Sequence, residues 1–530
     1  MSVATGVELS FHTIRRRAEH KLKKLDGRTL IRVGTATCGL AAGAAKVKQA
    51  FQREVSRRHL AAAVIETGCL GYCYAEPLVI ISKPGFPALA YGHADEGLVE
   101  RLVEDFLVNN DPCYEYALAA LESNDVFPTF ADFPRGVYEQ KIISGSCGLI
   151  DPEDIDHYLA GGGYAALAEA LCRPPGNIIQ EVKDANLRGR GGAGFPAGLK
   201  WEICRNQKES ERYIICNADE GDPGAFMDRS LLESNPHQVI EGMVIGAYAI
   251  GAKQGYIYIR AEYPLAINRV NLALKQARKK GLLGSSILNS GFHFELEVFQ
   301  GSGAFVCGEA TALVRSMEGK RGLPRHRPPH LTESGFRGRP TLLNNVKTFC
   351  YVPEIIRNGK ELFKNTGTNS SPGTALFSLV GKVVNTGLVE VPMGTTLRQL
   401  IFDVGGGIPG DKQFKAVQIG GPSGGCLPAS ALDIPIDFDS LHEAGAIMGS
   451  GGLVVLDEDD CMVSVARYFL EFTQQESCGQ CTFCRVGTKH MLDILTGITR
   501  GEGDAKSLDT LNDLAAEIKA GSLCSLGKTA

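Results

Sequence analysis

The stretch Leu187-Arg188-Gly189-Arg190-Gly191-Gly192-Ala193-Gly194-Phe195-Pro196 carries four glycines within six positions. Such a loop exposes backbone N–H groups that can hold a phosphate, and Arg190 or Lys200 adds positive charge. The spacing matches neither the G-x-G-x-x-G of a dinucleotide-binding unit nor a P-loop. By itself the stretch is equally compatible with a flexible turn, so its neighbours decide its interpretation.

Two apolar runs, residues 213–216 and 255–259, follow this loop and have the composition of buried parallel strands. The first run leads directly into Asn217-Ala218-Asp219-Glu220-Gly221-Asp222-Pro223-Gly224. The three carboxylates of this segment can bind a metal, accept hydrogen bonds from ribose hydroxyls or pair with an N–H of a flavin ring. The alternative is an acidic loop in solvent, which the preceding apolar strand makes less favourable.

Two more polar segments lie downstream. The second glycine-rich loop, Gly301-Ser302-Gly303-Ala304-Phe305-Val306-Cys307-Gly308-Glu309, leads into a helical pattern. The segment Asn344-Asn345-Val346-Lys347-Thr348 offers amides and a hydroxyl to a ribityl chain or a phosphate. Alone, this last segment would be an ordinary helix start.

Three cysteines near the end of the chain, Cys478, Cys481 and Cys484, form a C-x2-C-x2-C run, and Cys524 follows forty positions later. Three thiolates at this spacing can hold one face of a cubane cluster, and a remote fourth can close it. Zinc sites usually use paired C-x2-C units, and four unconnected buried cysteines are improbable at this spacing. We therefore predict a [4Fe–4S] cluster, with zinc as the main rival.

The chain divides by composition into segments of different character. We expect a basic helical leader at 1–30, a small α/β domain of βαββα order at 31–110 and a proline-containing linker at 111–137. Residues 138–372 alternate helices with glycine-rich loops, residues 373–440 have the pattern of a small α+β module, and residues 441–530 return to helix. The predicted fold class is α/β.

The 530 residues carry a net charge of −5 and are 44% apolar, as in ordinary globular proteins. No general basic field predicts nucleic-acid binding. No apolar run approaches the roughly 20 residues of a membrane-spanning helix, so direct membrane insertion is not expected. Without an apolar signal-peptide core, we expect a cytoplasmic protein whose 16 cysteines are metal ligands or buried apolar residues rather than disulfides.

Taken together, the four polar segments and the cysteine run resemble the NADH-binding flavoprotein subunit of respiratory complex I, over about residues 138–530. The same family serves NAD(P)-linked hydrogenases, formate dehydrogenases and electron-bifurcating enzymes. The resemblance implies a Rossmann-like FMN and NAD(P)-binding domain at 138–372, a ubiquitin-like (SLBB-type) domain at 373–440 and a helical [4Fe–4S] domain at 441–530.

The resemblance also implies the residues of each site. The FMN would be held by Gly189, Arg190, Gly191, Gly192, Lys200, Asn217, Asp219, Gly308, Asn344, Asn345 and Thr348. The nucleotide would stack on the flavin near Phe195, Glu220, Asp222 and Glu309, and the cluster would be held by Cys478, Cys481, Cys484 and Cys524. Hydride transfer needs no catalytic side chain, because the cofactors supply the chemistry.

The amino-terminal part resembles the thioredoxin-like [2Fe–2S] domain that some bacterial members carry fused. Cys38, Cys69 and Cys73 match its ligand loops, but Gly43 stands where fully ligated domains have a fourth cysteine. Two interpretations of this domain therefore stay open: it holds a [2Fe–2S] cluster at these cysteines, or it is a docking domain without a cluster.

Two departures from the family pattern bear on ligands and partners. Glu309 is followed by Ala310, where the family commonly has a second carboxylate, and Arg325 and Arg327 add positive charge nearby. Losing a carboxylate near the ribose weakens rejection of a 2′-phosphate, so we expect NADPH to be tolerated. The chain ends at Ala530, where relatives usually continue, so either it is truncated or a partner covers that surface.

The family implies hydride exchange between NAD(H) or NADP(H) and FMN, then single-electron transfer through the [4Fe–4S] cluster. The implied partners are a thioredoxin-like [2Fe–2S] subunit and a larger iron–sulfur or catalytic subunit, in a soluble hydrogenase, formate dehydrogenase or electron-bifurcating complex. The rival interpretation is a non-catalytic iron–sulfur scaffold or electron wire. A weaker rival is a zinc-bearing binding protein.

Overall fold

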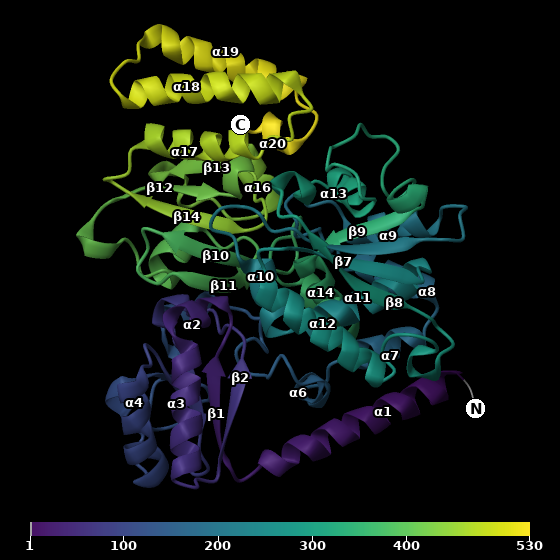
Figure 1. Cartoon of the computed structure of the whole chain (residues 1–530), viewed down its shortest axis with the longest axis vertical. Helices are drawn as coiled ribbons and strands as arrows, with labels where there is room; N and C mark the ends of the chain where they lie inside the picture. Colours follow the sequence, from purple (N-terminus) through teal and green to yellow (C-terminus); the bar gives the residue numbers. More distant parts are fainter. Residues whose placement is uncertain (1–2) are drawn as a thin grey trace.

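The computed structural model describes residues 3–530, which form three β-sheets and a C-terminal group of helices (Figure 1). The amino-terminal sheet lies at one end of the molecule and the C-terminal helices α17 to α19 lie at the other. The two remaining sheets lie between them. No helix of these residues is long and apolar enough to cross a membrane.

The first sheet has the strand order β2-β1-β3-β4-β5. Its strands are β1 (Thr29–Gly34), β2 (Ala62–Thr67), β3 (Val79–Ser82), β4 (Leu89–Tyr91) and β5 (Ala117–Ala120). β1 and β2 are parallel and are joined through α2 (Thr37–Ala42) and α3 (Ala44–Arg57), whereas β3 runs antiparallel to β1. Together with α4 (Glu96–Arg101), which packs on α3, these elements confirm the expected small α/β fold.

The segment 111–137 differs from the expected linker. β5 pairs with β4 at the edge of the first sheet, and α5 (Pro134–Tyr138) follows it. Its prolines flank the strand instead of interrupting it, and an edge position needs only one hydrogen-bonded neighbour. The helix α1 (Val3–Leu22), the expected leader, packs on α6 and α7 of the next domain.

The central sheet is fully parallel, with the order β8-β7-β6-β9. Its strands are β6 (Tyr213–Ala218), β7 (Gln254–Arg260), β8 (Glu295–Gly301) and β9 (Thr341–Asn345). The helices of this domain are α6 (Ile155–Ala160), α7 (Ala165–Leu171), α8 (Pro175–Asp184), α9 (Ala197–Arg205), α10 (Met227–Ser234), α11 (Pro236–Ile250), α12 (Pro264–Lys279), α13 (Ala310–Met317), α14 (Val346–Asn358) and α15 (Lys360–Lys364). The two apolar runs expected as parallel strands are β6 and β7.

The helix α11 is buried along nearly its whole length and crosses α14 at very short range. A Cβ atom at Gly242 would lie 2.0 Å from the carbonyl oxygen of Phe349, so only glycine fits at this crossing. The close approach of α14 carries Thr348 and the polar end of β9 towards the glycine-rich loop before α9.

The third sheet has the order β11-β10-β14-β12-β13. Its strands are β10 (Thr374–Gly381), β11 (Gly387–Pro392), β12 (Phe414–Ile419), β13 (Gly425–Pro428) and β14 (Gly452–Asp457), and α16 (Phe438–Glu443) belongs to the same module. The strands β10, β11 and β12 together with α16 agree with the small α+β module expected over residues 373–440. The expected boundary at 440 differs from the structure, because β14 returns to the middle of this sheet and pairs with both β10 and β12.

The C-terminal helices are α17 (Met462–Gln475), α18 (Thr488–Thr499), α19 (Ala505–Gly521) and the short α20 (Ser525–Lys528). α17 and α18 pack together, and α19 packs on α18. These are the helices expected after the α+β module, and they place the four C-terminal cysteines on the side of the central domain.

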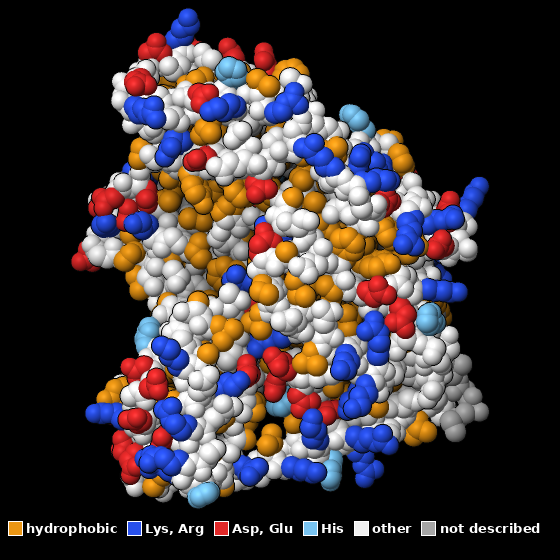
Figure 2. All heavy atoms as spheres, viewed as in Figure 1, with side chains coloured by type: hydrophobic (Ala, Val, Ile, Leu, Met, Phe, Trp, Pro, Cys, Tyr) orange, Lys and Arg blue, Asp and Glu red, His pale blue; other side chains and the backbone are white. Residues whose placement is uncertain are grey.

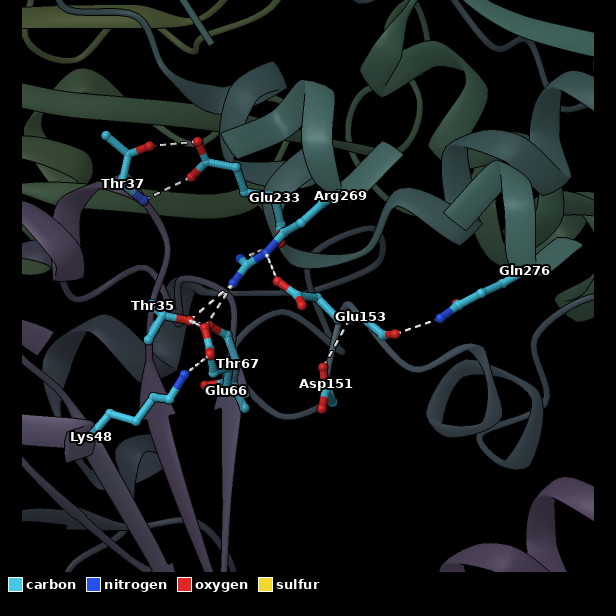
Figure 3. A network of polar contacts seen from close by, with 10 residues as sticks. All are labelled: Thr35, Thr37, Lys48, Glu66, Thr67, Asp151, Glu153, Glu233, Arg269 and Gln276. Carbon is cyan, nitrogen blue, oxygen red and sulfur yellow. Dashed lines mark hydrogen bonds and ion pairs between the residues drawn. The ribbon is translucent and has the colours of Figure 1, made fainter. Parts of the chain in front are cut away.

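A buried arginine joins the amino-terminal sheet to the central domain through hydrogen bonds and ion pairs (Figure 3). Arg269 of α12 is 1% exposed and donates to the hydroxyl of Thr35 at 3.0 Å and to the carbonyl of Glu233 at 2.8 Å. Its guanidinium also lies 3.3 Å from Glu153 and 3.6 Å from Glu66. A buried charge with this many partners keeps the two parts in one relative orientation.

Candidate functional site

The site expected from the sequence lies at the carboxyl edge of the central sheet. β6 and β9 are neighbours, and their register pairs Asn217 with Asn345. In open parallel sheets this edge is where ligands bind, because strand ends and helix starts meet there. The polar segments that follow β6 and β9 therefore share one edge.

The glycine-rich loop closes over this edge. The amide of Gly189 donates to Phe195 O at 2.9 Å, and the amide of Arg190 donates to the hydroxyl of Thr348 at 2.9 Å. A Cβ at Gly191 would lie 3.1 Å from Cβ of Asn345, and Gly192 has φ +116°. The loop is thus an ordered turn held against β9 and α14, and the alternative of a flexible turn does not hold.

Two cations flank the loop. Arg190 is buried, donates to Pro372 O at 2.6 Å and keeps its Nε atom without a hydrogen-bond partner. Lys200 of α9 donates to Leu343 O at 3.1 Å, and burial together with the nearby charge of Arg327 lowers the pKa of its ammonium to about 8. Both cations lack a carboxylate partner among the described residues, which suits a site for an anionic phosphate.

Asp219 follows β6 and is the most exceptional carboxyl of the edge. It is 8% exposed, and neither carboxylate oxygen has a hydrogen-bond partner. Burial raises the pKa of its carboxyl to about 7. The side-chain amide of Asn217 donates through Nδ2 to Gly308 O at 3.0 Å, which joins this strand end to the second glycine-rich loop.

Buried polar atoms in a folded protein are nearly always hydrogen-bonded, so several unpartnered ones at one edge indicate a ligand site. Among the described residues, the unpartnered buried atoms at this edge are both carboxylate oxygens of Asp219, Nε of Arg190 and Nη1 of Arg260. Sequence reasoning missed Arg260, which ends β7 beside β6. The sequence signal that could have identified Arg260 is its position as the last residue of a parallel strand. These groups fit a ligand with a phosphate and a polar ring, as FMN has.

The amide of Asn344, oriented to satisfy its neighbours, accepts from Trp201 Nε1 at 2.9 Å and donates to Leu343 O at 3.0 Å. Asn345 caps α14 by accepting from the amide of Lys347 at 3.0 Å and also donates to Asp228. The structure thus gathers all eleven residues expected for FMN at one edge, and several of them are engaged with protein partners.

The residues expected near the nucleotide have different environments. Glu220 is buried and accepts from the amides of Asp228 at 2.9 Å and Arg229 at 3.1 Å, at the start of α10. Asp222 accepts from the hydroxyl of Ser450 at 2.7 Å. Glu220 and Asp222 therefore support the loop after β6 from within.

Of the other two residues expected near the nucleotide, Phe195 is exposed and Glu309 is partly buried. Phe195 is 45% exposed, with the Lys200 ammonium 6.0 Å from its ring centre. Glu309 caps α13 by accepting from the amides of Thr311 at 2.9 Å and Ala312 at 3.0 Å, and it is also paired with Arg327. An exposed ring beside cations suits a stacked, anionic ligand.

The four C-terminal cysteines line a single cavity. Cys478, Cys481 and Cys484 come from the loop between α17 and α18, and Cys524 precedes α20. The amide of Leu523 lies 3.4 Å from the sulfur of Cys481, as a donor to a thiolate would. Val306, two residues before Gly308, forms part of the cavity wall. Four thiols around one enclosed space fit a cubane cluster, and Val306 places that space beside the loop that contacts the carboxyl edge of the central sheet.

The three amino-terminal cysteines also come together. The sulfurs of Cys38, Cys69 and Cys73 all lie within 4.8 Å of one another. Gly43, which stands in the place of a fourth thiol, has φ +109° and ends α2.

Residues 182–354 match the Nuo51 FMN-binding domain, residues 376–427 the SLBB domain and residues 464–530 the NADH-ubiquinone oxidoreductase-F iron-sulfur binding region. The NADP-reducing hydrogenase subunit HndC of Solidesulfovibrio fructosivorans is 56% identical over 389 residues, which are 73% of this chain and 79% of that protein. The chain belongs to this family of FMN and iron–sulfur subunits.

Two further relatives span respiratory and hydrogenase assemblies. An NADH-quinone oxidoreductase subunit of Escherichia coli is 43% identical over 365 residues, covering 68% of this chain and 82% of that protein. A crystal structure of NAD⁺-reducing [NiFe]-hydrogenase in the H2-reduced state superimposes with a TM-score of 0.66 and 29% identity, covering 99% of this chain and 89% of that one.

Membership in the family confirms the predicted α/β fold class, the FMN and [4Fe–4S] cofactors and the NADH dehydrogenase type of enzyme. It also confirms that the chain is an electron-transfer subunit of a multi-subunit oxidoreductase. The zinc-bearing alternative for Cys478, Cys481, Cys484 and Cys524 does not hold. The roles of individual site residues stay predictions.

Proposed function

We propose that this chain exchanges a hydride between NAD(H) or NADP(H) and FMN at the carboxyl edge of the central sheet, and passes single electrons through the cluster of Cys478, Cys481, Cys484 and Cys524. The observation that carries the proposal is the segment of residues 305–308. Its last residue, Gly308, accepts a hydrogen bond from Asn217 at the carboxyl edge of the central sheet. Val306 forms part of the wall of the cavity that the four C-terminal cysteines line. A short path between two redox sites is what a flavin-to-cluster relay needs.

The bound FMN would supply the conversion between two-electron hydride chemistry and single electrons. The chain's own residues position it. The amides of residues 189–192 with Arg190 and Lys200 would hold the phosphate, while Asn217, Asp219 and Asn344 would meet the polar ring and ribityl chain. Phe195 and the Glu309–Arg327 pair border the open side, where the nicotinamide nucleotide would stack.

We further propose that NADPH is accepted beside NADH. Arg327 is paired with Glu309, and its positive charge lies close enough to Lys200 to lower the pKa of that ammonium. We expect the 2′-phosphate of NADPH to pair with Arg327, and Ala310 offers no second carboxylate that would repel this phosphate.

Electrons would leave the chain at the C-terminal cluster. Phe483 and Val486, which flank the ligand Cys484, are 48% and 43% exposed, and Tyr468 of α17 is 54% exposed. Exposed aromatic and aliphatic groups beside a redox site favour a partner interface. Figure 2 shows charges of both signs spread over the ends of the molecule and apolar side chains gathered across its middle.

The partners proposed are a thioredoxin-like [2Fe–2S] subunit and a larger iron–sulfur or catalytic subunit, in a cytoplasmic hydrogenase, formate dehydrogenase or bifurcating complex.

The test is an anaerobic titration of the purified chain with NADH and, separately, NADPH, after assay of FMN, iron and sulfide. Flavin bleaching followed by a reduced-cluster EPR signal supports the proposal. A chain that holds a cluster but binds no FMN and does not bleach would instead be an iron–sulfur scaffold or electron wire.

A matched variant separates the two cofactors. Cys524→Ser removes one cluster ligand and leaves the flavin edge unaltered, so we expect loss of the cluster EPR signal with FMN content and flavin bleaching retained. Cys426→Ser, an exposed cysteine on β13, is the control and should keep both signals. Loss of FMN in Cys524→Ser would contradict the separation of the two sites.

A further inference from the structure

The three amino-terminal cysteines have a fourth potential ligand beside them. Cys38 donates from its sulfur to the carboxylate of Glu76 at 3.8 Å, and the other oxygen of Glu76 accepts from the amide of Leu78 at 2.8 Å. Glu76 is 8% exposed, so its carboxylate is directed at the thiols and away from solvent. No basic side chain pairs with it among the described residues.

We propose that Cys38, Cys69, Cys73 and Glu76 form a four-donor site for a single divalent metal ion of the zinc type. Zinc binds thiolate sulfur at about 2.3 Å in a tetrahedron, which places two thiolates about 3.8 Å apart. The sulfurs of Cys69 and Cys73 lie 3.7 Å apart, and all three sulfurs lie within 4.8 Å. Thiolates on the two irons of a [2Fe–2S] cluster lie across the cluster and are farther apart, so the spacing favours one ion.

The site is built at the junction of the amino-terminal and central domains. The amide of Thr37 donates to Glu233 at 2.9 Å, and the amide of Cys69 donates to the hydroxyl of Ser234 at 3.0 Å. A Cβ at Gly68 would lie 2.1 Å from that hydroxyl, so the loop docks directly on the end of α10. An ion here would tie both cysteine loops together at the surface that meets α10, next to the contact of Thr37 with Glu233 that Figure 3 shows.

The helix α10 links this junction to the flavin edge. Its first turn holds Asp228, which lies 2.9 Å from Lys347 beside Thr348, and its last turn holds Glu233 and Ser234. Eight helical residues span about 12 Å. The metal would therefore fix the far end of the helix whose near end supports the flavin loop.

The rival ligand is Cys147. This buried cysteine lines a small cavity together with Cys69 and is 7% exposed. Like the carboxylate of Glu76, its sulfur lies outside the group of three close sulfurs, but Glu76 contacts Cys38 at 3.8 Å. If Cys147 rather than Glu76 were the fourth ligand, the four thiolates would suit an iron–sulfur cluster as well as a zinc ion.

The test is elemental analysis of the full chain purified anaerobically, followed by cobalt substitution. We expect about one zinc-type ion per chain in addition to the roughly four irons of the C-terminal cluster. With cobalt in the site, tetrahedral thiolate bands should appear. Cys38→Ser should abolish the additional ion, and Glu76→Gln should weaken cobalt binding at least tenfold and shift its bands. Cys426→Ser is the control.

Three outcomes would overturn the proposal. One is two extra irons per chain that are lost in Cys147→Ser but kept in Glu76→Gln. Another is the absence of an extra ion even after incubation with Zn²⁺ or Co²⁺. The third is full retention of cobalt in Cys38→Ser. FMN content and C-terminal cluster iron, measured on the same samples, report on folding and on the proposed function separately.

Discussion

At the scale of single residues, the expected flavin site relies on cations that have no carboxylate partner among the described residues. Lys200 is the clearest case, because burial and Arg327 hold the pKa of its ammonium at about 8 in the ligand-free chain. A phosphate stabilises the protonated form and raises that pKa in the complex. Binding above pH 8 must therefore take up a proton.

The predicted consequence is a pH-dependent affinity for FMN. Above pH 8 the dissociation constant should rise by up to about tenfold per pH unit, because the carboxyl of Asp219, with a pKa of about 7, is by then ionised and the phosphate, with a second pKa of about 6, stays doubly charged. Flavin fluorescence quenching by the apoprotein measures this. Lys200→Arg should abolish the rise, because guanidinium stays charged, and a wild-type profile flat to pH 9.5 would contradict the role.

The pair of Arg327 and Glu309 sets the predicted nucleotide preference. Arg327→Gln should lower kcat/KM for NADPH about tenfold, or about 1.4 kcal/mol, and lower that for NADH much less, because only NADPH carries the 2′-phosphate. Steady-state assays with an artificial acceptor measure both. Arg339→Gln, an exposed arginine paired with Glu211, is the control. Equal losses of kcat/KM for NADH and NADPH would show that Arg327 does not bind the 2′-phosphate.

At the scale of elements, the crossing of α11 and α14 positions the polar edge. Gly242→Ala would push a methyl group against the carbonyl of Phe349, only 2.0 Å away. We expect destabilisation of about 3 kcal/mol, the upper end for overpacked cores, together with weaker FMN binding because α14 carries Thr348. Thermal unfolding measures the first effect and flavin titration the second.

Gly176→Ala is the matched control for that variant. This glycine lies in the first turn of α8, and a Cβ there would meet no atom within 4 Å. Alanine should leave stability equal or raise it by about 0.5–1 kcal/mol, because it restricts the unfolded chain. A Gly242→Ala protein as stable as Gly176→Ala would mean that α11 and α14 can move apart without a loss in the free energy of unfolding.

At the scale of the whole molecule, Arg269 holds the amino-terminal domain in place. Arg269→Met would leave Glu66 and Glu153 facing a neutral side chain and the carbonyl of Glu233 without its donor. Removing one partner of a buried ion network costs about 3–5 kcal/mol. We expect faster hydrogen exchange in β1, β2 and the cysteine loops, with the C-terminal helices unchanged.

Arg53→Met is the control, because the Arg53 side chain is 55% exposed and forms only ion pairs near the surface, with Glu96 at 3.3 Å and Glu54 at 3.9 Å. Such pairs contribute about 0–1 kcal/mol, so exchange rates should stay as in the wild type. Uniform exchange changes across the whole chain in Arg269→Met would indicate general destabilisation instead of domain release.

The sequence alone determined the α/β class, the family and both cofactors, because those depend on short segments whose residues act together within a loop: the glycines of 189–194 and the cysteines of 478–484. It also predicted the strands β6 and β7, which bury local apolar runs. Tertiary structure alone decided the places of β5 and β14, since strand pairing joins residues far apart in the chain. The same holds for Arg260, Arg269 and Glu76, each an ordinary charged residue in its own segment. Their importance arises only where packing removes water and leaves the charge facing a partner from another element.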